Sequence, residues 1–124
     1  MKRAQVKVDE SLLKEVVRRI LSVREVRSII LFGSHARGDA HGGSDLDILI
    51  IETENPLPRC DRALAYRMAL GNLERDFDID ILVYTLEELE DWSEVPNAFP
   101  TRAVREGRVL YEERSSGPGQ RVAG

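Results

Sequence analysis

The chain has 124 residues, of which 42% are hydrophobic and 32% charged, and its formal net charge is −4. This length accommodates one domain, and the acidic balance argues against broad nucleic-acid binding, which depends on basic surface. No run of 18 apolar residues is present and the N-terminus lacks the apolar segment of a signal peptide, so we expect neither a membrane span nor secretion. The single cysteine, Cys60, is typical of a reducing compartment, so the predicted location is the cytoplasm.

The first third of the chain predicts a helix followed by a buried strand. Residues 9–23 carry apolar side chains at helical spacing, and Asp9 is the expected N-cap. Residues 26–32 end in an unbroken apolar run, which is typical of a strand covered on both faces. Gly33 ends this strand, and the next residues are expected to open a short helical turn.

The middle of the chain predicts a second strand, a helix and a third strand. The strand covers residues 45–51, and after a proline-containing loop the helix covers residues 61–75. The apolar stripe expected on this helix consists of Ala63, Tyr66, Leu70 and Leu73. The third strand covers residues 78–84, where apolar and acidic side chains alternate between the two faces.

The last third predicts two short helices and an edge strand. Thr85 and Glu88 fit a capping box at the start of a helix that ends near Trp92. Pro96 and Pro100 are expected to interrupt the chain before a helix over residues 101–106, which Gly107 caps, and residues 109–111 add a strand. We therefore expect a single domain over residues 1–114 and a flexible tail, rich in Ser, Gly and Pro, over residues 115–124.

Two alternate carboxylates open the second strand. Alternate strand residues share a face, so Asp45 and Asp47 project side by side with Cα atoms roughly 6.5–7 Å apart. Carboxylates this close repel each other unless a cation lies between them. Mg²⁺ is preferred where carboxylates meet phosphate oxygens, so the pair predicts a metal site that also uses a nucleoside triphosphate.

A third carboxylate would complete a two-metal site, with ions roughly 3.5–4 Å apart. Asp80 is the first candidate, because it lies early in a strand that can pair beside the strand carrying Asp45 and Asp47. Asp78 shares its face and is the alternative. Asp45 and Asp47 also fit ordinary solvent-facing acids at a strand start, and Asp80 and Asp78 also fit structural acids.

The turn after the first strand suits a phosphate chain. Gly33 lets the backbone come close to a phosphate, and Ser34 offers a hydroxyl and an N–H at an expected helix start. Arg37 could clamp phosphate oxygens, although pairing with Asp39 fits it equally well. Together with the acids, this turn predicts a site for phosphate transfer.

The segment Gly33-Ser34-His35-Ala36-Arg37-Gly38-Asp39, followed by Ser44-Asp45-Leu46-Asp47, resembles the signature of the DNA polymerase beta-like nucleotidyltransferase superfamily. The short chain resembles a minimal nucleotidyltransferase (MNT) in particular. The resemblance implies an α+β fold with a mixed, mainly antiparallel sheet of about four strands flanked by helices. It also implies that Ser44 belongs to the nucleotide site and that Asp80, before an apolar run, is the third acid.

The resemblance further implies Mg²⁺-dependent transfer of a nucleoside monophosphate, with AMP from ATP expected, to a hydroxyl group. Many MNT proteins resemble antitoxins that adenylylate a tyrosine of a small helical HEPN-type partner. The rival hypotheses are a non-catalytic module that neutralises such a partner by binding it, and a small-molecule transferase that acts as a homodimer.

Overall fold

The central feature of the fold is a four-stranded sheet with the strand order β3-β2-β1-β4. The computed structural model describes residues 10–33, 46–71, 73, 79–92, 94–95 and 98–113. The strands are β1 (Ser28–Phe32), β2 (Leu46–Glu52), β3 (Ile79–Thr85) and β4 (Arg108–Glu112). β1 pairs antiparallel with β2 and β4, whereas β2 and β3 are parallel, so the predicted mixed and mainly antiparallel sheet is confirmed.

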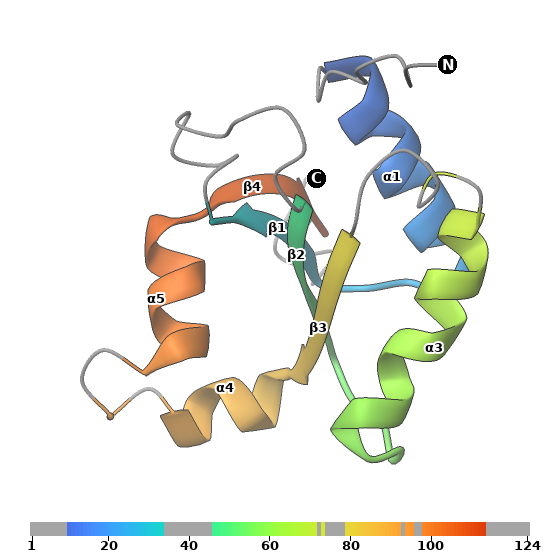
Figure 1. Ribbon diagram of the computed structural model, residues 1–124. Coiled ribbons are helices and arrows are strands. Elements are labelled where there is room, and N and C mark those ends of the chain that lie inside the picture. The colour runs from blue at the N-terminus through green and yellow to red at the C-terminus, as the bar shows by residue number, and fades with distance from the viewer. Residues whose placement is uncertain are drawn as a thin grey trace, which may run out of the picture.

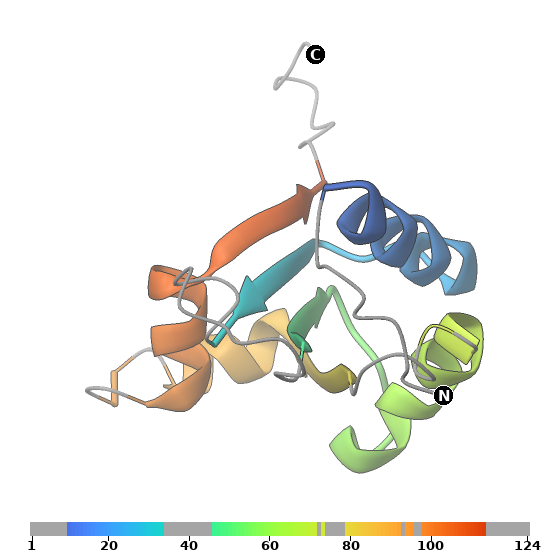
Figure 2. The same cartoon turned by 45° about the horizontal axis from the view of Figure 1, so that its top comes forward.

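Helices cover both faces of this sheet (Figure 1). α1 (Glu10–Val23) and α3 (Arg59–Leu70) lie on one side, and α4 (Leu86–Trp92) and α5 (Phe99–Glu106) lie on the other, as the second view also shows (Figure 2). None of the described helices has the length and apolar character that crossing a bilayer requires. The expected flexible tail over residues 115–124 and the domain boundary at residue 114 lie outside the described residues.

The larger core lies between the sheet and the pair α1 and α3, because each element contributes one apolar face. It consists of Leu13, Val16, Ile20, Val26, Ile29, Leu31, Leu46, Ile48, Ile50, Tyr66, Leu70, Ile79, Ile81 and Val83. The smaller core, between the sheet and α4 and α5, consists of Ile30, Leu49, Ile51, Tyr84 and Ala103. The central strands β1 and β2 are therefore buried on both faces, as their unbroken apolar runs predict.

Most predicted elements are confirmed to within a residue or two, and two boundaries were wrong. α3 begins at Arg59 and ends at Leu70, five residues early, because Gly71 takes a positive φ of 44° that ends the helix. α5 includes Pro100 in its first turn instead of starting after it, since the first turn needs no N–H donor at that position. The N-cap expected at Asp9 lies outside the described residues.

The capping box at the start of α4 is confirmed. The Glu88 amide donates to Thr85 Oγ1 at 3.2 Å, and the Thr85 amide donates to Glu88 Oε1 at 3.0 Å. α4 therefore starts directly at the end of β3, which fixes its place over the same face of the sheet.

Candidate active site

Asp47 and Asp80 are register partners across the parallel strands β2 and β3. Each is the second residue of its strand, and residues that face each other on adjacent strands point to the same side of a sheet. Asp47 shares its face with Leu49, and Asp80 shares its face with Tyr84, so both carboxylates lie on the side of α4 and α5. Asp47 is half-buried and Asp80 is exposed.

Gly33 lies at the same end of the sheet. Phe32, the last residue of β1, is the antiparallel register partner of Asp47, and Gly33 follows it with a φ of 79°. A Cβ added to Gly33 would lie 3.2 Å from Cγ of Asp47 and would overlap its Oδ2. The glycine turn and the acid at the start of β2 are therefore in direct contact.

The two acids fit a hard divalent cation. Strands pair roughly 5 Å apart, so two carboxylates in register repel each other unless positive charge lies between them. Oxygen ligands are those that Mg²⁺ prefers. In the described ranges, no group of three or more His, Cys, Asp or Glu side chains is gathered around a metal position. The remaining candidates for that group, Asp45 and Asp78, lie outside these ranges.

The sequence-predicted site residues therefore divide into two groups. The structure places Gly33, Asp47 and Asp80 together at one end of the sheet. The other candidates lie outside the described residues: Ser34, Arg37, Ser44, Asp45 and the alternative acid Asp78.

A second polar cluster, which the sequence did not predict, lies at the opposite ends of β2 and β3. Glu52 is 1% exposed and accepts hydrogen bonds from the Tyr66 hydroxyl and from Asn55 Nδ2 at 2.8 Å, with Arg24 Nη1 3.4 Å away. Burial raises the pKa of Tyr66, and the hydrogen bond to Glu52 raises it further, so the phenol keeps its proton.

Arg62 is the second buried charge at this end. Its guanidinium donates to both carboxylate oxygens of Glu88, at 2.7 and 3.0 Å, and to the carbonyl oxygens of Leu57 and Val83. The hydrogen bond from Arg62 lowers the pKa of Glu88 to about 2. These contacts join α3, β3 and α4, so we assign this cluster a structural role. No local sequence signal identifies it, because the partners of Arg62 are up to 26 residues away.

Comparison with known proteins identifies the family to which the chain belongs. Residues 14–116 match the family described as "Polymerase beta, Nucleotidyltransferase". The chain is also 33% identical over 117 residues to the "Putative protein adenylyltransferase MJ0604" of Methanocaldococcus jannaschii, covering 83% of this chain and 98% of that protein. The chain thus belongs to the polymerase beta nucleotidyltransferase family, and it is a nucleotidyltransferase. This confirms the resemblance that its Gly-Ser and Asp-Leu-Asp motifs indicate.

Two solved structures share the fold at lower sequence identity. A "putative nucleotidyltransferase from Sulfolobus solfataricus" is 20% identical, with a TM-score of 0.57 over 82% of this chain and 78% of that one. A structure described as "the toxin-antitoxin with AMP-PNP" is 19% identical, with a TM-score of 0.60 over 82% of this chain and 74% of that one. Both support the arrangement of helices and sheet described above.

Proposed function

We propose that this chain is an Mg²⁺-dependent adenylyltransferase that transfers AMP from ATP to a hydroxyl group on a protein. The in-register pair of Asp47 and Asp80 beside Gly33 carries the proposal, because it combines a cation site with a backbone turn that a phosphate can approach. The relative described as a protein adenylyltransferase supports the same class of reaction.

The roles follow from the chemistry of the residues. Asp45, Asp47 and Asp80 would hold Mg²⁺, which when bound neutralises phosphate charge and lowers the pKa of the acceptor hydroxyl. Gly33, Ser34 and Ser44, with Arg37, would orient the triphosphate. The acceptor oxygen bonds to the α-phosphorus, the bond from that phosphorus to the β-phosphate oxygen breaks, and pyrophosphate leaves. Asp80 takes up the hydroxyl proton or passes it to water.

The acceptor that we propose is a tyrosine of a small helical HEPN-type protein, with this chain as the antitoxin of the pair. The supporting observations are the MNT-like motifs and a structural neighbour described as a toxin–antitoxin bound to AMP-PNP. Such a pair would act in a reducing cytoplasm, which is consistent with the single cysteine.

Labelled ATP tests the proposal. The chain is incubated with ATP labelled on the α-phosphate, Mg²⁺ and the protein encoded beside it, and label on that protein is measured. We expect Asp47→Asn and Asp80→Asn each to lower the rate of transfer at least about 100-fold. Circular dichroism should show that the fold is intact. Asp91→Asn, an exposed acid on α4, is the matched control and should keep full activity.

The other outcomes separate the rival hypotheses. Full activity in Asp47→Asn would refute the site. Activity that survives Asp80→Asn but not Asp78→Asn would move the third acid to Asp78. A stable complex without label transfer would favour the binding module, and transfer to a small molecule in the absence of a partner would favour the small-molecule enzyme.

A further inference from the structure

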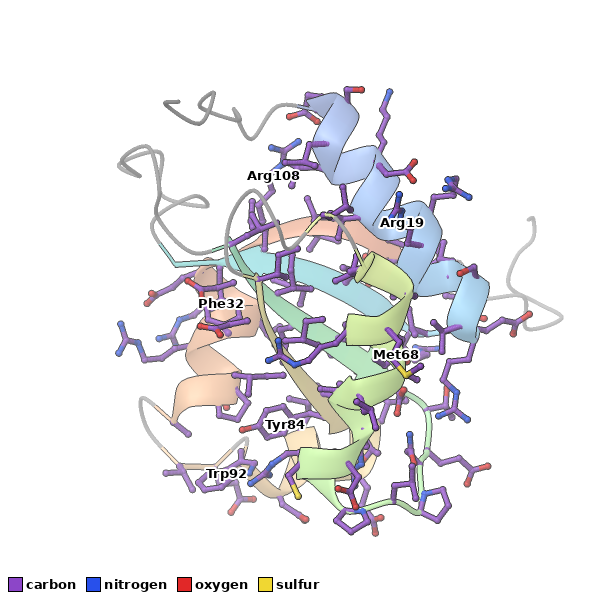
Figure 3. The ribbon with its side chains drawn as sticks, turned by 45° about the vertical axis from the view of Figure 1, so that its right-hand side comes forward. Arg19, Phe32, Met68, Tyr84, Trp92 and Arg108 are labelled. Carbon is purple, nitrogen blue, oxygen red and sulfur yellow. The ribbon has the colours of Figure 1, made fainter. Side chains whose placement is uncertain are left out.

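The outer side of α3 exposes large apolar side chains. The inner side of this helix is buried through Tyr66 and Leu70, yet Leu64 is 61% exposed and Met68 is 73% exposed. Leu57, just before the helix, is 50% exposed. Figure 3 shows Met68 on the side of α3 that is turned away from the sheet.

We define the α3 surface as five exposed uncharged residues of α3 and of the loop before it: Leu57, Cys60, Leu64, Ala65 and Met68. An exposed helix face in a chain that is one-third charged is expected to carry charged side chains. Among the exposed described residues of α3, Arg59 and Asp61 are the charged ones, and both lie in its first turn. Leu64 and Met68 lie one helical turn apart, and neighbouring exposed apolar side chains of this size are typical of a contact surface.

This surface is separate from the candidate active site. α3 covers the face of the sheet that holds the larger core, whereas Asp47 and Asp80 point to the opposite face, beside α4 and α5. A partner on α3 would therefore leave both acids accessible to nucleotide and acceptor. An acceptor bound next to Asp80 would in turn not cover Leu64 or Met68.

The charges on α3 suit a second copy of the same helix running in the opposite direction. Asp61 lies in the first turn and Arg67 in the last, and an antiparallel pair centred on Leu64 would place Asp61 of each copy opposite Arg67 of the other. Arg67 donates to the carbonyl oxygen of Ile79 at 3.0 Å, and a guanidinium, with five N–H donors, can add an acceptor to those that it already holds. The opposed helix dipoles favour the same orientation.

We propose that two copies of this chain associate through the α3 surface, with antiparallel helices and Leu64 at the two-fold axis. Ala65, beside this axis, lets the helices approach closely. A single pair of 12-residue helices buries less than a standard interface, so we expect a weak dimer.

Sedimentation equilibrium across protein concentrations tests the association. Leu64→Glu is expected to raise the dimer Kd at least about tenfold, because the dimer would bury a charge at its centre. Asp61→Arg should raise it about fivefold or more, since like charges would then face each other. Val104→Glu, at a 39% exposed position of α5, is the matched control and should leave the Kd unchanged.

The single cysteine tests the orientation directly. An antiparallel pair centred on Leu64 places the two Cys60 Cα atoms about 15–20 Å apart, whereas a parallel pair brings them within about 10 Å. The distance between spin labels attached to the two Cys60 side chains distinguishes these arrangements. Thermal melting verifies that each variant is folded. The proposal is overturned if the chain stays monomeric at every concentration up to about 1 mM. It is also overturned if Val104→Glu breaks the dimer and Leu64→Glu does not, or if the Cys60 distance is that of a parallel pair.

Discussion

Gly33 and Asp47 touch across the first two strands of the chain. Gly33 has a left-handed φ of 79°, and the Asp47 side chain occupies the space that a Cβ on Gly33 would need. Glycine thus serves two purposes here: it permits the backbone conformation, and it leaves room for a carboxylate. The turn and the acid are consequently one unit of the site.

Gly33→Ala is expected to lower nucleotidyl transfer on the order of 100-fold, because the methyl group displaces the Asp47 carboxylate from its position opposite Asp80. Backbone strain should lower the free energy of unfolding by about 1–2 kcal/mol. Transfer rates and urea unfolding measure the two effects separately.

Gly71→Ala is the control for this prediction. Gly71 also has a positive φ, of 44°, but a Cβ there would meet no atom within 4 Å. Its alanine variant should lose a similar amount of stability and keep its activity. Equal losses of activity in both variants would mean that strain alone, and not contact with Asp47, explains the effect at Gly33.

The sequence predicted the part of the site that depends on local pattern. Alternation along β3 placed Asp80 on one face, and the apolar runs of β1 and β2 identified strands buried on both sides. Pairing of β2 with β3 could be anticipated, but the exact register that sets Asp47 opposite Asp80 could not, because a helix and more than twenty residues separate the strands.

The buried charges were not predictable for the same reason. The sequence indicated an apolar stripe on α3 that includes Tyr66 and Leu70, and gave no sign that Arg62 is buried beside them. A guanidinium is tolerated there only because Glu88 and two carbonyl groups surround it, and these come from three other segments of the chain. Such a network depends on tertiary structure, which periodicity does not encode.

Glu88→Gln is expected to make stability less dependent on pH in acid. The hydrogen bond from Arg62 lowers the pKa of Glu88 from 4.5 to about 2 in the folded chain. The stabilisation is therefore complete above pH 4.5 and is lost as the pH falls toward 2. At pH 7, the variant should be about 1–3 kcal/mol less stable than the parent. At pH 2, where Glu88 of the parent is becoming protonated, the two should differ little. Urea unfolding at several pH values measures this.

Salt separates this effect from a second one in the same pH range. Arg18 and Arg19 also lower the pKa of Glu15 to about 2, but that group lies on the surface of α1, where salt screens the interaction. In 1 M salt, the pH dependence of stability should therefore still differ between the parent and the Glu88→Gln variant, because this difference comes from Glu88. A Glu88→Gln variant that keeps the parent's full pH dependence in high salt would contradict this.

Tyr66→Phe is expected to lower the free energy of unfolding by about 1–3 kcal/mol, because Glu52 is buried and loses the hydroxyl as a donor. Asn55 and Arg24 would remain as its partners. Tyr111→Phe, at a partly buried position against the same core, is the control, and it should change stability by less than about 0.5 kcal/mol. Equal losses in the two variants would show that the hydroxyl of Tyr66 contributes nothing specific.

Gly107 is where α5 meets β1, and its substitution tests how closely the two pack. Gly107 has a φ of −81°, so the left-handed conformation does not explain the glycine; instead, a Cβ would lie 2.6 Å from the Ala103 carbonyl oxygen and 2.8 Å from that of Leu31. Gly107→Ala should therefore cost about 1–3 kcal/mol of unfolding free energy through overpacking. Because β1 leads directly into Gly33, we also expect the nucleotidyl transfer rate to fall. A stable variant with full activity would show that α5 can shift from β1 without disturbing the site.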